Sequence, residues 1–155
     1  MPTGLPEPTA DEREHAGLVR DNTARKASLA FGFYRVMAYV TGAWLLLLVV
    51  EMVLKYVVDI NGDHAPVLGT WIAIAHGMIY VVYVLSVFNL WSLMRWSFGR
   101  MVYLVIAGVV PVLSFVLERK AETWFREDLP GVLDAVESRA LRRAQISRLK
   151  TERER

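Results

Sequence analysis

Four polar side chains lie within or at the ends of apolar stretches, where chemistry would be possible: Arg35, Glu51, Lys55 and His76. Placing such a group in hydrocarbon costs free energy, so these residues usually mark an ion path, a proton path or a structural contact. Glu51 precedes Lys55 by four residues, which is the favourable order for an ion pair on a helix. A local ion pair is one interpretation, and a carboxylate that handles protons or cations is the other. Arg35 fits a cation that reaches back to the membrane interface.

His76 lies within residues 65–94, a stretch without charged residues. This depth predicts a hydrogen-bonded contact between helices, with a proton relay as the alternative. The other two histidines, His15 and His64, lie in a tail and a loop, and cysteine is absent. We therefore expect no haem, no metal and no other cofactor. No hydrolase triad, phosphate loop or dinucleotide motif is present, so we expect no catalytic residues and no enzyme activity.

Small residues recur at four-residue spacing in two of the apolar stretches. Gly69, Ala73 and Gly77 form the longer series, and Ala38 and Gly42 form the shorter one. Small side chains let another helix approach closely in a membrane. The pattern predicts helix packing, either within one bundle or against a second copy or another membrane protein.

Three apolar stretches are available to position these residues. They cover 29–58, 67–91 and 101–117, within a chain that is 54% hydrophobic. A helix needs roughly 20 apolar residues to cross a bilayer, so the third stretch is short, and it contains Pro111. The sequence predicts an all-α membrane bundle of three transmembrane helices with a helical C-terminal tail. The expected organisation is a flexible cytoplasmic tail over 1–28, a three-helix transmembrane domain over 29–118 and a charged tail over 119–155.

The distribution of Lys and Arg predicts the orientation of the chain. It favours a cytoplasmic N-terminus, a cytoplasmic loop at Arg95 and an outer loop at Asp59–Pro66. Three crossings would place the basic C-terminal tail outside, which this rule disfavours. A re-entrant third segment would keep the tail inside, but it needs surrounding protein that a short chain scarcely offers. We therefore expect three crossings.

Two contacts follow from three crossings. Glu51 and Lys55 would share the outer interface with Glu118 and Arg119, so these four should form an ion-pair cluster. Pro111 leaves a backbone carbonyl free one turn earlier, at about the depth of His76. We expect the His76 ring to donate a hydrogen bond to a carbonyl near Ala107 or Gly108.

The C-terminal tail contains a helix-breaking pair, Pro130-Gly131, and then a periodic apolar stripe. The stripe consists of Val132, Leu133, Val136, Ala140, Leu141, Ala144 and Leu149. It fits a solvated helix, a helix on the membrane surface or a helix paired with a partner. Basic residues in the tails are not interleaved with aromatic ones, so a nucleic acid is not an expected partner.

The segment from Leu29 to Lys120 resembles a known family. The matching pieces are Leu54-Lys55-Tyr56, His76-Gly77, Arg95-Trp96-Ser97-Phe98-Gly99-Arg100 and Leu117-Glu118-Arg119. In order and spacing they are similar to the YdzA-like family of small bacterial integral membrane proteins, domain of unknown function 3817. The resemblance implies a multi-pass protein of an actinobacterial plasma membrane and supplies no activity.

The expected function is that of a non-enzymatic accessory or assembly subunit of a larger membrane complex. The alternative is a small transporter or channel unit that works as an oligomer. The expected partners are the lipid bilayer and either other membrane subunits or further copies of the chain.

Overall fold

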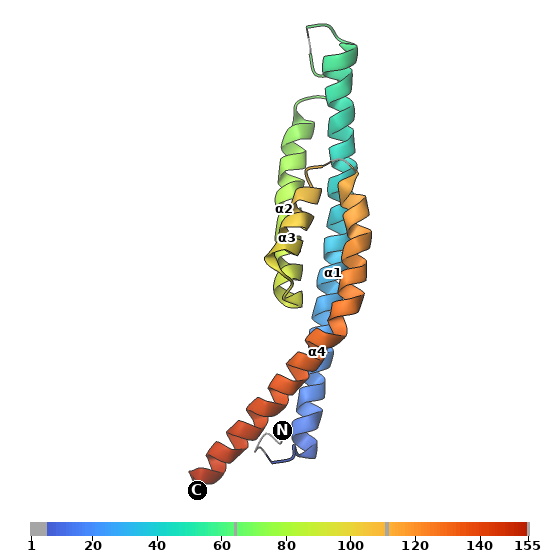
Figure 1. Ribbon diagram of the computed structural model, residues 1–155. Coiled ribbons are helices and arrows are strands. Elements are labelled where there is room, and N and C mark those ends of the chain that lie inside the picture. Colours follow the sequence, from blue (N-terminus) through green and yellow to red (C-terminus); the bar gives the residue numbers. More distant parts are fainter. Residues whose placement is uncertain (1–5, 64, 111, 155) are drawn as a thin grey trace.

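The structure is a computed structural model that describes residues 6–63, 65–110 and 112–154. Throughout these residues the regular structure is helical, as predicted. The elements are α1 (Ala10–Val53), a π-helical turn η1 (Leu54–Val58), α2 (Trp71–Met94), α3 (Phe98–Ala107) and α4 (Leu113–Arg153). Figure 1 shows α2 running back along α1, α3 reversing again beside α2, and α4 returning along α1.

Helix α1 begins at Ala10, far before the first apolar stretch. Thr9 and Glu12 form a reciprocal capping box: the Glu12 amide donates to Thr9 Oγ1 (3.3 Å) and the Thr9 amide donates to Glu12 Oε2 (2.8 Å). This cap satisfies amides that a helix start leaves free. Residues 10–28 are therefore helical, and the flexible tail predicted there is wrong for these residues.

The third apolar stretch does not form a third helix of spanning length. Helix α3 has 10 residues, roughly 15 Å of length, or about half the thickness of a bilayer core. A turn follows Ala107 over residues 108–110, and α4 runs back toward the end from which α3 came (Figure 1). We call this unit the α3–α4 hairpin. Two helices remain long and apolar enough to cross a membrane: Ala10–Val58, which is α1 with η1, and Trp71–Met94.

Side chains of α2 pack around the end of α3. They supply the surrounding protein that we did not expect a short chain to offer. The Tyr83 hydroxyl donates to the Leu104 carbonyl (2.6 Å), and the Tyr80 hydroxyl donates to the Val105 carbonyl (3.1 Å). Both rings pack at Gly108, where an added Cβ would lie 2.7 Å from an atom of each. Carbonyls in the last turn of α3 thus have side-chain donors, as a helix end packed against other helices requires. Pro111, which predicted a free carbonyl here, lies outside the described residues.

Helices α1 and α4 meet closely at Gly42. A Cβ added there would lie 2.3 Å from Ser114 Oγ and 3.0 Å from the Phe115 ring. Below this contact, Tyr34, Tyr83 and Leu90 are fully buried in the core between α1, α2 and α4. The absence of a side chain at position 42 therefore sets how closely the returning helix approaches α1.

Helix α4 continues through Pro130, so the predicted break is wrong. Figure 1 shows α4 changing direction along its length instead, which is the usual effect of a proline within a helix. The seven stripe residues beyond it are all partly buried. Arg20 of α1 lies 3.5 Å from Asp134 and 3.4 Å from Glu137 of α4. The stripe thus faces the start of α1 in the same chain.

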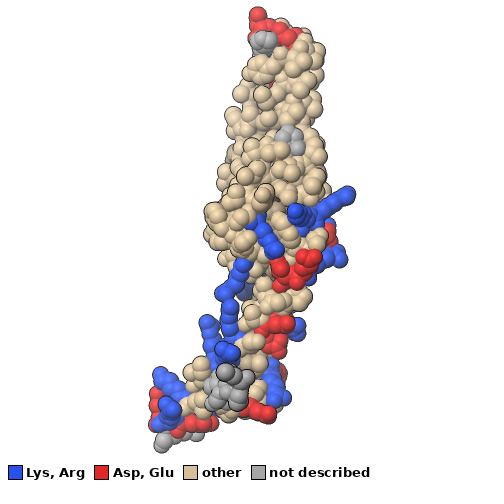
Figure 2. Space-filling model, in the orientation of Figure 1, with Lys and Arg blue, Asp and Glu red and all other residues tan. Residues whose placement is uncertain are grey.

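We call residues 10–27 of α1 together with residues 130–153 of α4 the paired arm. Further contacts tie its far end: Gln145 Nε2 donates to the Pro6 carbonyl (2.8 Å), and Arg148 lies 3.5 Å from Glu12. Figure 2 shows charged side chains over this arm and over the adjoining end of the rest of the molecule, and an almost uncharged surface beyond them, apart from acidic residues at the opposite tip. The molecule consequently has an apolar body and a charged arm.

Candidate functional site

Arg35 joins α1 to α4 where the apolar body meets the arm. Its Nε lies 2.6 Å from Glu118 Oε1, and its terminal nitrogen lies 2.7 Å from Glu122 Oε2. Glu118 is fully buried and also accepts a hydrogen bond from the Tyr39 hydroxyl (3.0 Å). A buried carboxylate needs such partners to remain charged. Arg35 therefore links α4 to α1 through ion pairs.

Glu122 is the partly exposed carboxylate of this cluster. The hydrogen bond from Arg126 (2.6 Å) lowers the pKa of Glu122 below its ordinary value, and the positive charge of Arg35 acts in the same direction. The carboxylate therefore remains ionised at neutral pH and links two arginines.

The predicted cluster of Glu51, Lys55, Glu118 and Arg119 is wrong. The hairpin returns α4 to the end of the body where Arg35 lies, so Glu118 pairs with Arg35. Glu51, at the other end of α1, accepts hydrogen bonds from the amides of Val67 (2.9 Å) and Leu68 (2.8 Å). It is buried, and it fastens the loop before α2 to α1. The Lys55 ammonium lies 4.8 Å from the Tyr56 ring centroid.

His76 does not make the hydrogen bond that we predicted. Its Nδ1 is buried and has no hydrogen-bond partner among the described residues. The Leu104 and Val105 carbonyls, one turn before the turn of the hairpin, are bonded by Tyr83 and Tyr80 instead. The prediction is therefore wrong in both donor and acceptor, and the donors from α2 are phenols that sequence reasoning missed.

The same side chains form a polar row inside the body. The His76 ring lies 6.2 Å from the Tyr80 ring, Tyr80 lies 6.2 Å from Tyr83, and Tyr83 lies 6.0 Å from Tyr34. We call these four residues the tyrosine row. Spacings of four and three place positions 76, 80 and 83 on one helix face. This periodicity of polar groups was a signal available in the sequence.

The small residues fall into two groups. Ala38 is buried and Gly42 contacts α4, whereas Ala73 and Gly77 lie on an exposed face of α2. A Cβ added at Gly77 would meet no atom within 4 Å. Gly69 lies before the first residue of α2, in a left-handed conformation (φ +102°), so the predicted three-residue helical series is wrong at its first member.

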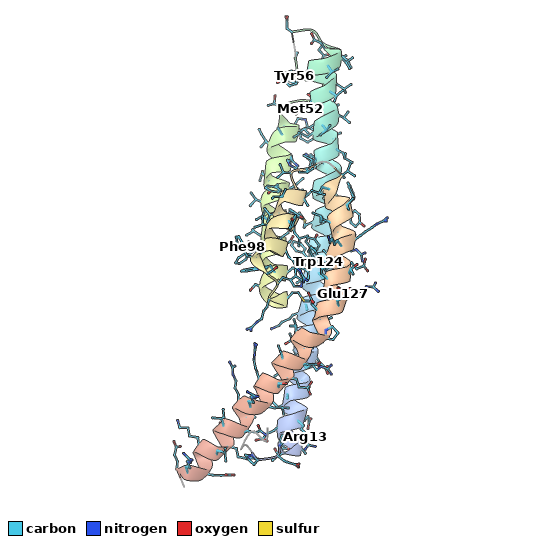
Figure 3. The ribbon with its side chains drawn as sticks, in the orientation of Figure 1. Arg13, Met52, Tyr56, Phe98, Trp124 and Glu127 are labelled. Atoms are coloured by element: carbon cyan, nitrogen blue, oxygen red, sulfur yellow. The ribbon has the colours of Figure 1, made fainter. Side chains whose placement is uncertain are left out.

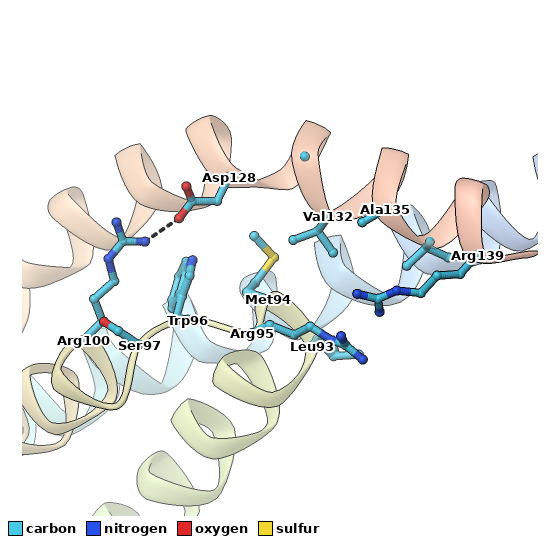
Figure 4. Close-up of a pocket in the computed structure, with 12 residues that line it drawn as sticks. Leu93, Met94, Arg95, Trp96, Ser97, Arg100, Asp128, Val132, Ala135 and Arg139 are labelled. Atoms are coloured by element: carbon cyan, nitrogen blue, oxygen red, sulfur yellow. Dashed lines mark hydrogen bonds and ion pairs between the residues drawn. The ribbon is translucent and has the colours of Figure 1, made fainter. Parts of the chain in front are cut away.

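A cavity of about 500 Å³ lies between the α2–α3 loop and α4. We call it the basic pocket, because its charged lining residues are Arg95, Arg100, Arg139 and Asp128. Figure 4 shows the α2–α3 loop on one side of it and α4 on the other. The pocket lies near the Arg35 cluster, at the end of the body that carries the arm. Sequence reasoning missed it as a site, although Arg95 and Arg100 belong to the motif that carries the family resemblance.

Aromatic and ionic contacts surround Trp124, which Figure 3 labels. Trp124 of α4 contacts Trp96 edge to face, with ring centroids 6.1 Å apart. The Arg100 guanidinium lies 4.9 Å from the Trp124 ring centroid and pairs with Asp128. The floor of the pocket is thus fixed by aromatic and ionic contacts. Within the part of the chain that the structure describes, no group of three or more metal-ligating side chains comes together.

The fold and these contacts define an all-α protein with two helices of membrane-spanning length. A family model described as Domain of unknown function (DUF3817) matches residues 31–123, which is more than half of the chain, and the chain belongs to this family. An uncharacterized protein of Mycobacterium tuberculosis is 41% identical over 85 residues, which is 55% of this chain and 67% of that protein. An uncharacterized protein of Mycobacterium leprae is 40% identical over 93 residues, which is 60% of this chain and 72% of that protein. No solved structure matches the chain.

Proposed function

We propose that this protein is an integral membrane accessory subunit that crosses the bilayer twice and assembles with other membrane proteins. The observation that carries the proposal is the division into an apolar body and a charged paired arm (Figure 2). The body has the helix lengths of a membrane domain, and the arm has charges that belong in water. Such an arrangement presents two surfaces to partners, one within the membrane and one beside it.

The distribution of cations supports a cytoplasmic arm in a plasma membrane. Lys55 is the only Lys or Arg between Arg35 and Arg95, and it lies in η1, at the end of the body farthest from the arm. With two crossings and a re-entrant hairpin, the N-terminal part of α1, the α2–α3 loop and the end of α4 all lie at the other end. The C-terminal charges then agree with the positive-inside rule, which three crossings would have violated.

Exposed residues on both parts offer contacts to a second chain. In the body, the exposed face of α2 includes Ala73 and Gly77, and small residues there permit close approach of another helix. In the arm, Leu18 and Ile146 are each 57% exposed although this part would lie in water. A partner that covers apolar side chains on the arm would be stabilised by their burial.

Site-specific photocrosslinking in native membranes tests this proposal. A photoreactive amino acid placed at Ile146 should crosslink to a chain of different sequence, identified by mass spectrometry. One placed at Gly77 should crosslink within the membrane to the same complex. The control position is Leu104, which is buried and should give no intermolecular product. Absence of heterologous crosslinks from both exposed positions would contradict an accessory role.

The tyrosine row favours one alternative, a transporter or channel unit that works as an oligomer. Hydroxyls and an imidazole in line within an apolar body are groups that polar substrates or protons require. Flux of protons across liposomes containing the purified protein, lost in His76→Gln and Tyr34→Phe, would support this alternative. Crosslinking at Gly77 only between identical chains would favour it as well.

A further inference from the structure

The basic pocket has the charge of an anion-binding site. Three arginines and one aspartate line it, and the aspartate, Asp128, is already paired with Arg100. Arg95 and Arg139 are exposed and form no ion pair with a described residue. In Figure 4 their side chains extend into the same region beside the pocket. Two guanidinium groups that line one cavity without a carboxylate between them favour an anionic ligand.

Trp96 supplies a donor that lacks an acceptor. The residue is 5% exposed, and its indole Nε1 is buried with no hydrogen-bond partner among the described residues. Figure 4 shows the ring standing in the pocket between Arg100 and Met94. Buried N–H groups are nearly always bonded, so an unbonded one that lines a cavity points to a missing acceptor. A phosphate oxygen is such an acceptor.

The backbone beside the pocket adopts an energetically unfavourable conformation at one residue. Arg95 ends α2 in the left-handed conformation (φ +53°), where glycine is usual because it has no side chain. Three residues later α3 begins at Phe98, with no side-chain hydrogen bond from Ser97 and no acidic residue in its first turn. The partly positive end of α3 therefore remains uncompensated beside the pocket. Strain of this kind at a charged residue is typical of binding sites.

An apolar groove adjoins the pocket on its membrane side. Leu93 lines both cavities, and the groove is otherwise lined by Lys26, Leu29, Ala30, Phe33 and Asn89. The groove lies between α1 and α2, so it continues from the charged end of the body onto the apolar surface. A free phosphate ion would use only the pocket, whereas a phospholipid would place its headgroup in the pocket and an acyl chain along the groove.

We infer that the basic pocket binds the phosphate headgroup of an anionic phospholipid through Arg95, Arg139 and the Trp96 indole N–H. Basic pockets at the cytoplasmic ends of membrane helices commonly bind such headgroups. The ligand would hold the α2–α3 loop against α4, and so fix the base of the hairpin. This inference requires membrane insertion but not the accessory role, so either proposal can fail without the other.

Lipid binding by the full chain in detergent tests the inference, with retention measured by native mass spectrometry and stabilisation measured by thermal unfolding. Phosphatidylglycerol should bind at least about tenfold more tightly than phosphatidylcholine, because two guanidinium contacts depend on its net negative charge. The double substitution Arg95→Gln and Arg139→Gln should remove this preference. The matched control is Arg142→Gln with Arg143→Gln, since both arginines are exposed on α4 outside the pocket lining.

Two further measurements test the indole N–H and distinguish a phospholipid from a free phosphate ion. Trp96→Phe keeps an aromatic ring and removes the N–H, so it should weaken phosphatidylglycerol binding several-fold while the helical circular dichroism stays unchanged. Inorganic phosphate at millimolar concentration should neither stabilise the protein nor compete with the lipid. Equal binding of both lipids, equal loss in the control variant, or stabilisation by phosphate alone would overturn the inference.

Discussion

The second and third apolar stretches are alike in composition but differ in structure. Helix α2 has 24 residues and runs without interruption, whereas the third stretch is divided between α3, a turn and the start of α4. Apolar composition decides that a segment leaves water, but it does not decide whether the segment crosses to the other side. That choice depends on whether a reversal of the backbone at half depth can find hydrogen-bond partners.

In this chain the partners come from α2 itself. Tyr80 and Tyr83 bond the last carbonyls of α3, Gly108 leaves room for their rings, and Gly42 leaves room for the returning helix. The charged residues of α4 then lie at the same end as Arg35 rather than at the opposite end. The hairpin therefore brings α4 into the position where it forms the ion pairs, the paired arm and the basic pocket.

The largest expected effect concerns the side on which α4 ends. The chain has no cysteine, so single cysteines at Asn61, Ser97 and Ser147 can be labelled with an impermeant reagent on whole cells. The hairpin predicts that Ser147 behaves like Ser97, and the cation distribution predicts that only Asn61 is labelled. Labelling of Ser147 together with Asn61 would show that the chain crosses the membrane three times. The third apolar stretch would then span the membrane as α2 does.

The second prediction concerns the ion pair that the hairpin creates. Removing Arg35 leaves the buried Glu118 carboxylate without its cation, so Arg35→Gln and Glu118→Gln should be coupled in a double-mutant cycle of unfolding free energy. We expect a coupling free energy of about 2 kcal/mol. This is less than a fully buried pair gives, because the Arg35 side chain is 41% exposed. The control cycle, Glu51→Gln with Arg119→Gln, should be additive, since these residues belong to opposite ends of the body.

The third prediction compares two glycines. Gly42→Ala adds a methyl group where Ser114 and Phe115 already lie, so it should destabilise the protein by about 1–3 kcal/mol. Gly77→Ala meets open space and should be neutral or slightly stabilising, because alanine favours a helix. Thermal unfolding in detergent measures both. Equal effects of the two substitutions would show that α4 does not pack at Gly42.

The fourth prediction concerns the donors to the hairpin. Tyr83→Phe removes the hydrogen bond to the Leu104 carbonyl and should cost about 1 kcal/mol of unfolding free energy. Tyr103→Phe is the matched control, because Tyr103 lies on α3 and is 64% exposed. Hydrogen exchange of the α3 amides should rise only in the first variant. Unchanged exchange there would mean that the hairpin does not depend on this donor.

The smallest expected effect concerns pH. The pKa of Glu122 is lower in the folded state than its ordinary value, so its contribution to stability is present above the ordinary pKa and is lost as the pH falls through the folded pKa. Thermal stability should therefore fall as the medium is acidified below about pH 4.5. Glu122→Gln should reduce this dependence slightly. High salt should reduce it too, because the side chain is partly exposed to solvent. If the unmodified protein and Glu122→Gln lose thermal stability identically on acidification, Glu122 makes no such contribution.

Much of the fold was determined by the sequence alone. Charge-free stretches identified both helices of spanning length, and the helical C-terminal tail followed from its periodic apolar stripe. The four-residue spacing of Ala38 and Gly42 singled out the part of α1 that α4 contacts, although it did not name the partner helix. These features are local in the chain, so composition and periodicity report them directly.

The tertiary structure alone decided the course of the third stretch and the partners of its charges. Its 17 residues allowed either a short crossing or a hairpin, and the choice rests on contacts between residues far apart in the sequence, such as Tyr83 with Leu104 and Gly42 with Ser114. Once the chain reverses, Glu118 lies beside Arg35 instead of Lys55, and Arg139 lines the same pocket as Arg95. A single reversal moves every later residue to the other end of the body, and no local pattern in the sequence records it.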